Sequence, residues 1–122
     1  MATKLEKRVN TPGNGTDYPK RGDTVTMDYT GWLYDPAKAA NDYKGKQFDS
    51  SVGRADFVVQ IGIGRVIPGW DQGVPTMSLG EKSTLTIPGT LGYGERGFPG
   101  LIPPNSTLIF DVHLKGIGNK SI

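Results

Sequence analysis

The feature that most constrains the fold of this chain is a glycine-rich run that leads into one short helix. The run spans Gly62–Gly73 and reads GIGRVIPGWDQG. Pro68 suits the first helical position, because the amide hydrogen that proline lacks would have no helical acceptor there. Pro75 keeps the helix short, and Leu79-Gly80 ends it. Three apolar residues share one helical face: Trp70, Val74 and Met77. The indole at the helix entrance predicts the apolar floor of a pocket.

Several other segments alternate apolar and polar side chains with the period of a β-strand. They are residues 24–33, 57–61, 84–87 and 108–114, with residues 3–9 as a weaker candidate. Half-buried antiparallel strands need a cover for their apolar face, and the short helix is the available one. We therefore predict an α+β fold in which a twisted antiparallel β-sheet wraps around one short central α-helix.

The alternation also predicts which side chains face the helix. In the first long strand the inward residues are Val25, Met27, Tyr29, Gly31 and Leu33. Trp32 then faces outward. In the last strand Phe110 faces inward, whereas Ile109 and His113 face outward, and His113 is predicted to be a solvated strand residue. Residues 36–42 contain helix-forming alanines but little apolar face, so we expect an exposed loop with at most one helical turn.

Length, composition and charge exclude several classes of function. At 122 residues the chain is long enough for one domain, residues 1–122, with one core. It has no Cys and one His, which argues against thiol chemistry, nucleophilic catalysis and metal binding, and we expect no cofactor. A net charge of +2 without a basic run argues against nucleic acid as a partner. Since there is no apolar leader and no long apolar segment, we expect no membrane partner and a cytoplasmic location.

A glycine motif late in the chain points to a loop. Residues 92–97, GYGERG, match the G-x-G-x-x-G pattern of dinucleotide sites. Pro99, Pro103 and Pro104 follow, however, where a dinucleotide fold requires a helix. The pattern therefore favours a Gly/Pro-rich loop and argues against a nucleotide cofactor.

Four segments resemble the FKBP family of peptidyl-prolyl isomerases. They are Met27–Gly31, Phe48–Ser51, Val66–Trp70 and Tyr93–Gly100, in consistent order within a match that runs from Gly22 to Gly118. The resemblance implies the FKBP fold, cis-trans isomerase activity on X-Pro bonds in proteins, and binding of the inhibitory macrolides tacrolimus and rapamycin. It also implies that residues 93–104 form a flap over the mouth of the pocket.

The resemblance further implies a set of site residues. Five would be catalytic: Tyr29, Asp49, Trp70, Tyr93 and Phe110. Nine more would contact substrate or drug: Phe48, Arg54, Phe57, Arg65, Val66, Ile67, Phe98, Leu101 and Ile102. The substrate proline would lie on Trp70, and the Ile67 amide and the Tyr93 hydroxyl would donate to peptide carbonyls. Asp49 would be held near Tyr29 and Arg54. Without the resemblance, an Asp before two serines is more typical of a turn cap.

Two other functions remain open at this point. A non-catalytic module could use the same pocket to hold a proline-containing partner, but the full set of aromatic residues favours the enzyme. A nucleic-acid binder would rest on the basic pI alone. The resemblance also implies a monomer whose drug complex recruits calcineurin or the rapamycin target kinase. Residues 34–46 form a longer connection than in the smallest family members.

Overall fold

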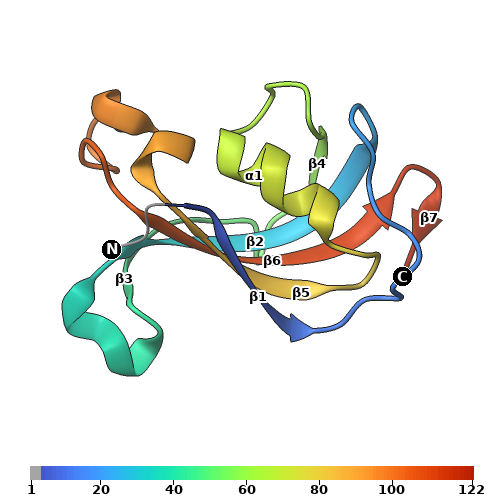
Figure 1. Ribbon diagram of the computed structural model, residues 1–122, viewed down its shortest axis with the longest axis horizontal. Helices are drawn as coiled ribbons and strands as arrows, with labels where there is room; N and C mark the ends of the chain where they lie inside the picture. The colour runs from blue at the N-terminus through green and yellow to red at the C-terminus, as the bar shows by residue number, and fades with distance from the viewer. Residues whose placement is uncertain (1–3) are drawn as a thin grey trace.

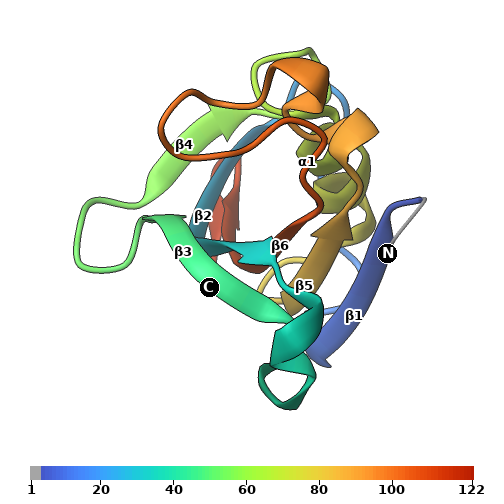
Figure 2. The ribbon, with the colours of Figure 1, turned by 90° about the vertical axis from the view of Figure 1, so that its left-hand side faces the viewer.

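The computed structural model describes residues 4–122, and in them seven strands form one antiparallel sheet (Figure 1). The strands are β1 (Glu6–Thr11), β2 (Thr24–Tyr34), β3 (Lys44–Ser50), β4 (Phe57–Gln60), β5 (Lys82–Ile87), β6 (Leu108–Ile117) and β7 (Lys120–Ser121). Their order is β1-β5-β6-β2-β3, with β4 also paired to β2 and β7 to β6. The sheet curves around one α-helix, α1 (Pro68–Gly73), as Figure 2 shows from the side. The predicted α+β architecture is confirmed.

Helix α1 begins where the sequence predicts and ends earlier. Pro68 is its first residue. After Gly73 the chain continues as a 3-10 turn, η2 (Val74–Thr76), because Pro75 has no amide hydrogen to donate to the preceding turn. The Thr76 hydroxyl donates to the Gly73 carbonyl at 2.6 Å and so satisfies one carbonyl of the helix end. The prediction that the helix extends to Leu79-Gly80 was wrong.

The face of the sheet that packs on α1 carries the predicted alternation. Val25, Met27, Leu85 and Leu114 are fully buried there, in one core cluster with Trp70. Gly69 lets the helix approach the sheet, since a Cβ at this position would lie 2.6 Å from the Ile87 side chain.

On the opposite face of the sheet, two outward-facing residues are more buried than the alternation indicates. Ile109 is only 2% exposed, because it lies on the central strand β6 between Trp32 of β2 and Thr86 of β5. His113 is half-buried rather than solvated, and burial, followed by the charges of Lys82 and Lys115, lowers its pKa. Trp32 does face outward as predicted, with Lys44 Nζ 4.5 Å from the centre of its ring.

Two segments have more regular structure than the sequence indicates. Strand β1 runs to Thr11 rather than Val9, with a register irregularity between those residues, and the predicted start at Thr3 lies outside the described residues. Strand β3 was not predicted, because its residues are mostly polar and lie at the edge of the sheet. Residues 36–41 form a 3-10 helix, η1 (Pro36–Asn41), which is exposed as expected but longer than one turn.

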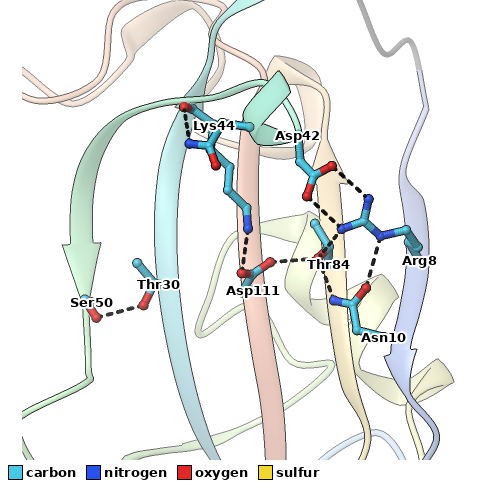
Figure 3. Close-up of polar contacts among 9 residues, drawn as sticks. Arg8, Asn10, Thr30, Asp42, Lys44, Ser50, Thr84 and Asp111 are labelled. Atoms are coloured by element: carbon cyan, nitrogen blue, oxygen red, sulfur yellow. Dashed lines mark hydrogen bonds and ion pairs between the residues drawn. The ribbon is translucent and has the colours of Figure 1, made fainter. Parts of the chain in front are cut away.

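A polar network on the outer face of the sheet connects four strands and the segment that follows η1 (Figure 3). Lys44 Nζ donates to Asp111 Oδ2 at 2.8 Å, and Thr84 Oγ1 donates to Asp111 Oδ1 at 2.7 Å. Asn10 donates to Thr84 in turn, and the Arg8 guanidinium lies 3.3 Å from Asp42. The 36–43 segment therefore lies on the side of the sheet opposite α1, as Figure 1 also shows.

Candidate active site

A cavity of about 250 Å³ opens beside α1, at the end of the sheet where β3 and β4 meet β2. Its walls come from seven different parts of the chain, which no local sequence pattern could connect. The lining residues are Tyr29, Phe48, Asp49, Phe57, Arg65, Val66, Ile67, Trp70, Tyr93 and Phe110. All ten belong to the set that the sequence predicts for the site.

The floor and walls of the cavity are aromatic rings set edge to face. Trp70 is 5% exposed, and its ring centre lies 4.9 Å from that of Tyr29, 5.1 Å from Phe110 and 5.7 Å from Phe57, at interplanar angles of 74–80°. Phe48 meets Phe110 at 5.5 Å and 87°. Edge-to-face pairs place the positive edge of one ring on the negative face of another, which fixes the orientation of each ring. The result is an aromatic cup with rigid walls.

Gly31 is a structural requirement of this cup. A Cβ at this position would lie 2.6 Å from Phe110 Cε1 and 2.8 Å from Phe48 Cζ. Both distances are shorter than any real Cβ contact, so a larger residue would push the two rings apart. The glycine on β2 thus lets Phe48 of β3 and Phe110 of β6 meet above it.

One side of the cup carries a hydrogen-bonded carboxylate. The Tyr29 hydroxyl donates to Asp49 Oδ2 at 2.7 Å, and Arg54 Nη2 donates to Asp49 Oδ1 at 3.0 Å. The Ser50 amide also donates to Asp49 Oδ1, at 2.8 Å. Burial raises the pKa of Tyr29 to about 12, and the hydrogen bond and negative charge of Asp49 add to the effect. Tyr29 therefore stays protonated and holds the carboxylate in place.

Tyr93 supplies a second phenol at the mouth of the cavity. Burial raises its pKa, and the charge of Asp49 acts in the same direction. The hydroxyl is thus a neutral hydrogen-bond donor at physiological pH. Tyr93 is still 37% exposed, so a ligand can reach it.

The other predicted flap residues lie outside the cavity wall. Phe98 is 48% exposed and touches Tyr93 edge on, with ring centres 6.0 Å apart. The Phe98 and Ile102 backbones exchange two hydrogen bonds of 2.8 Å, and the Ile102 side chain is buried in the core. Leu101 is 43% exposed. Contact of Phe98, Leu101 and Ile102 with a ligand stays a prediction.

Sequence reasoning missed the role of Asp71, which shapes the rim of the cup. Its carboxylate accepts from the Gly62 amide at 2.7 Å and from the Gly64 amide at 2.9 Å. Both glycines have positive φ, 83° and 81°, which side-chain-bearing residues rarely adopt. These bonds fix the loop that carries Arg65, Val66 and Ile67. An acidic residue in the first helical turn after a Gly-x-Gly run was the available signal.

Two features of residues 4–122 bear on other functions. No group of three or more His, Cys, Asp or Glu side chains in this part of the chain is arranged to hold a metal ion. None of its helices is long and apolar enough to cross a membrane.

Comparison with known proteins agrees with the fold and the aromatic cup. Residues 15–115 match the family model described as FKBP-type peptidyl-prolyl cis-trans isomerase. FK506-binding protein 1 of Gibberella zeae is 60% identical over 93% of this chain and 98% of its own length. A peptidyl-prolyl cis-trans isomerase of Schizosaccharomyces pombe is 58% identical, and FK506-binding protein 1A of Aspergillus fumigatus is 59% identical, each over 95% of this chain and 96% of the relative. The chain belongs to the FKBP-type peptidyl-prolyl cis-trans isomerase family.

Proposed function

We propose that the aromatic cup is where this chain binds proline-containing segments and accelerates cis-trans isomerisation of the X-Pro bond. The observation that carries the proposal is the cup itself, with a buried indole as its floor and a hydrogen-bonded carboxylate on one side. A proline ring is compact, apolar and of a size that fits a 250 Å³ cavity. The bond N-terminal to the ring then lies at the mouth of the cup.

The proposed mechanism needs no covalent step. Rotation about a peptide bond costs about 18–20 kcal/mol because the planar amide has partial double-bond character. X-Pro bonds populate both isomers but interconvert over tens to hundreds of seconds, which leaves a slow step to accelerate. The twisted amide is less polar than the planar one, since resonance no longer separates charge. An apolar, water-poor cup therefore favours the twisted transition state over the ground state.

Three polar groups of the cup have a proposed part in this mechanism. The amide of Ile67, just before α1, would donate to one peptide carbonyl, and the Tyr93 hydroxyl would donate to a second. These two bonds would hold the segment while the X-Pro bond turns. Asp49 would set the electrostatic field at the twisted amide without transferring a proton. Its three hydrogen-bond donors keep the carboxylate in a fixed position.

The same cup is proposed to bind the macrolides tacrolimus and rapamycin. Support comes from the relatives whose names describe them as FK506-binding proteins and from the cup. We extend the proposal to recruitment of calcineurin or the rapamycin target kinase by the drug complex, through a rim that includes Phe98 and Arg54. The same proposal holds that the protein is a monomer with one domain, works without a cofactor and lies in the cytoplasm. Gel filtration would test the oligomeric state, and imaging would test the location.

A protease-coupled assay on tetrapeptides of the type Ala-X-Pro-Phe tests the enzyme. We expect cis-to-trans conversion faster than the spontaneous rate, greatest where X is apolar, and inhibition by tacrolimus. If folded protein leaves the spontaneous rate unchanged, the catalytic proposal is wrong. Binding of proline peptides without acceleration would instead support the non-catalytic module.

A further inference from the structure

The charges that line the aromatic cup are not balanced. Two charged side chains contribute to its wall, Asp49 and Arg65. Asp49 forms an ion pair with the Arg54 guanidinium at 3.0 Å and accepts a hydrogen bond from the Tyr29 hydroxyl at 2.7 Å. The Arg65 side chain forms no ion pair and no hydrogen bond with any residue from 4 to 122. The cup therefore presents one positive charge that no neighbouring group neutralises.

The backbone that carries Arg65 is held firmly although its side chain is exposed. The Gly64 amide, directly before it, donates to Asp71 Oδ2 at 2.9 Å, and the Gly62 amide donates to Oδ1 at 2.7 Å. Directly after it, Val66 and Ile67 line the cavity, and the Ile67 carbonyl accepts from the Trp70 amide at 3.0 Å. The guanidinium therefore extends from a fixed point on the rim, which reduces the entropy lost when it binds a partner.

We propose that Arg65 gives this site a preference for peptides that carry a carboxylate beside the X-Pro bond. The inference rests on the proposed isomerase function and concerns its substrate selection. A guanidinium presents a planar fork of donors that matches a carboxylate, and its charge is permanent. A carboxylate on a bound peptide would pair with the Arg65 guanidinium, which has no partner among residues 4–122. We therefore expect an acidic side chain to be preferred over its neutral amide at one of the positions beside the X-Pro bond.

The size of the effect follows from the exposure of the pair. An ion pair between exposed side chains stabilises the bound state only modestly. For Arg65 and a peptide carboxylate this corresponds to a roughly twofold to fivefold gain in kcat/KM at low ionic strength. Salt should remove most of it, because the screening length falls to about 3 Å at 1 M. Contacts of the proline ring with Trp70 are apolar and should be less sensitive to salt.

The test compares peptide pairs that differ only in Glu against Gln at one position. Three such pairs are made. The varied residue is two before the proline in the first pair, directly before it in the second and directly after it in the third. Isomerisation is followed by exchange NMR without a coupling protease, because a protease would add its own preference for charge. Each pair is measured with the wild-type chain, with Arg65→Gln and with Arg65→Glu.

Two controls separate a local contact from the general positive charge of the protein. Lys38→Gln removes one positive charge from η1, on the opposite side of the sheet. Arg96→Gln removes an exposed arginine from the 3-10 turn η4 (Gly94–Arg96), which follows Tyr93 and does not line the cup. Both variants change the net charge by the same amount as Arg65→Gln.

We expect a Glu:Gln ratio of kcat/KM of about two to five at one or more positions in the wild-type chain. The ratio should fall to about one in Arg65→Gln, drop below one in Arg65→Glu, and stay at its wild-type value in both controls. A ratio near one at every position in the wild-type chain overturns the inference, as does an equal loss in Arg65→Gln and Lys38→Gln. Acceleration of the Gln peptides by the wild-type chain tests the isomerase function separately, so the two failures are distinguishable.

Discussion

The two faces of the sheet are built by opposite means. On the face toward α1, flat rings meet edge to face and leave a cavity whose floor is Trp70. On the outer face, Lys44, Asp111 and Thr84 belong to a chain of hydrogen bonds and ion pairs that crosses from strand to strand (Figure 3). One face depends on shape and burial, and the other on directional polar contacts.

The comparison shows why the aromatic cavity forms on the face toward α1. Large rigid rings cannot rearrange to fill the space between them, so the cup persists without a ligand and binding needs little reorganisation. Long polar side chains can shift and re-form their bonds with water, so no single contact decides the arrangement of the outer face. We therefore expect single changes to be costly on the α1 face and mild on the outer face.

The largest difference in loss of stability should appear between Phe110→Ala and Thr84→Ala, which each change one buried residue, on opposite faces of the sheet. Truncation of a buried aromatic ring costs about 3–5 kcal/mol, and Phe110 contacts both Phe48 and Trp70. Loss of the Thr84 hydroxyl bond to Asp111 should cost about 1 kcal/mol. Urea denaturation measures the free energy of unfolding of both variants. Isomerase activity should fall strongly only in Phe110→Ala. Equal losses of stability would contradict the comparison.

The two tryptophans provide an optical test, since each lies on one face. Trp70 lines the cup, whereas Trp32 lies on the outer face under Lys44. A bound macrolide should exclude water from the Trp70 indole and leave Trp32 unchanged. The emission change on tacrolimus titration should thus survive Trp32→Phe and largely vanish in Trp70→Phe, with calorimetry to confirm that each variant binds. A signal that follows Trp32 would place the ligand elsewhere.

Asp49→Asn tests the polar side of the cup without removing a ring. The folded protein should keep its stability near neutral pH, because the amide fills the same space, while activity falls several-fold if the charge acts on the twisted amide. The pKa of Tyr29, about 12 in the wild-type chain, should fall toward 10, since a neutral partner no longer opposes ionisation.

The Tyr29 shift also sets a dependence of stability on pH. The folded-state pKa lies above the unfolded value of about 10, so the contribution of neutral Tyr29 is complete below pH 10 and is lost as pH rises toward 12. NMR of the tyrosine ring carbons gives the titration midpoint residue by residue. An unchanged midpoint in Asp49→Asn would mean that burial alone sets the pKa.

The smallest effect is expected for Arg8→Gln on the outer face. The Arg8–Asp42 pair is exposed on both sides, with 56% and 54% of the two side chains accessible, so its loss should cost less than about 1 kcal/mol. Activity should be unchanged, because the pair is on the face opposite the cup. A large loss of activity would show that the 36–43 segment is coupled to the cup through β3.

Much of the fold could be predicted because burial imposes a period on the sequence. The alternation around Val25, Met27 and Tyr29 predicts which side chains of β2 face α1, and Pro68 predicts the first residue of α1. Strand β3 could not be predicted, since its polar residues pair only at the edge of the sheet and carry little alternation. Ile109 faces outward with Trp32, as the alternation predicts, yet it is buried, because it lies between the cross-strand neighbours Trp32 and Thr86.

The sequence by itself determined the family, through its motifs, and the face on which each tryptophan lies, through its periodicity, because both are local properties of the chain. The residues of the cup followed from the resemblance to the family and not from any local pattern. Tertiary structure alone decided the rest. Asp71 reaches back to Gly62 and Gly64, and among residues 4–122 the Arg65 side chain is left without a partner on the rim. Such pairings depend on where separate segments meet in space. A side chain's partner, unlike its period, cannot be read from its neighbours in the sequence.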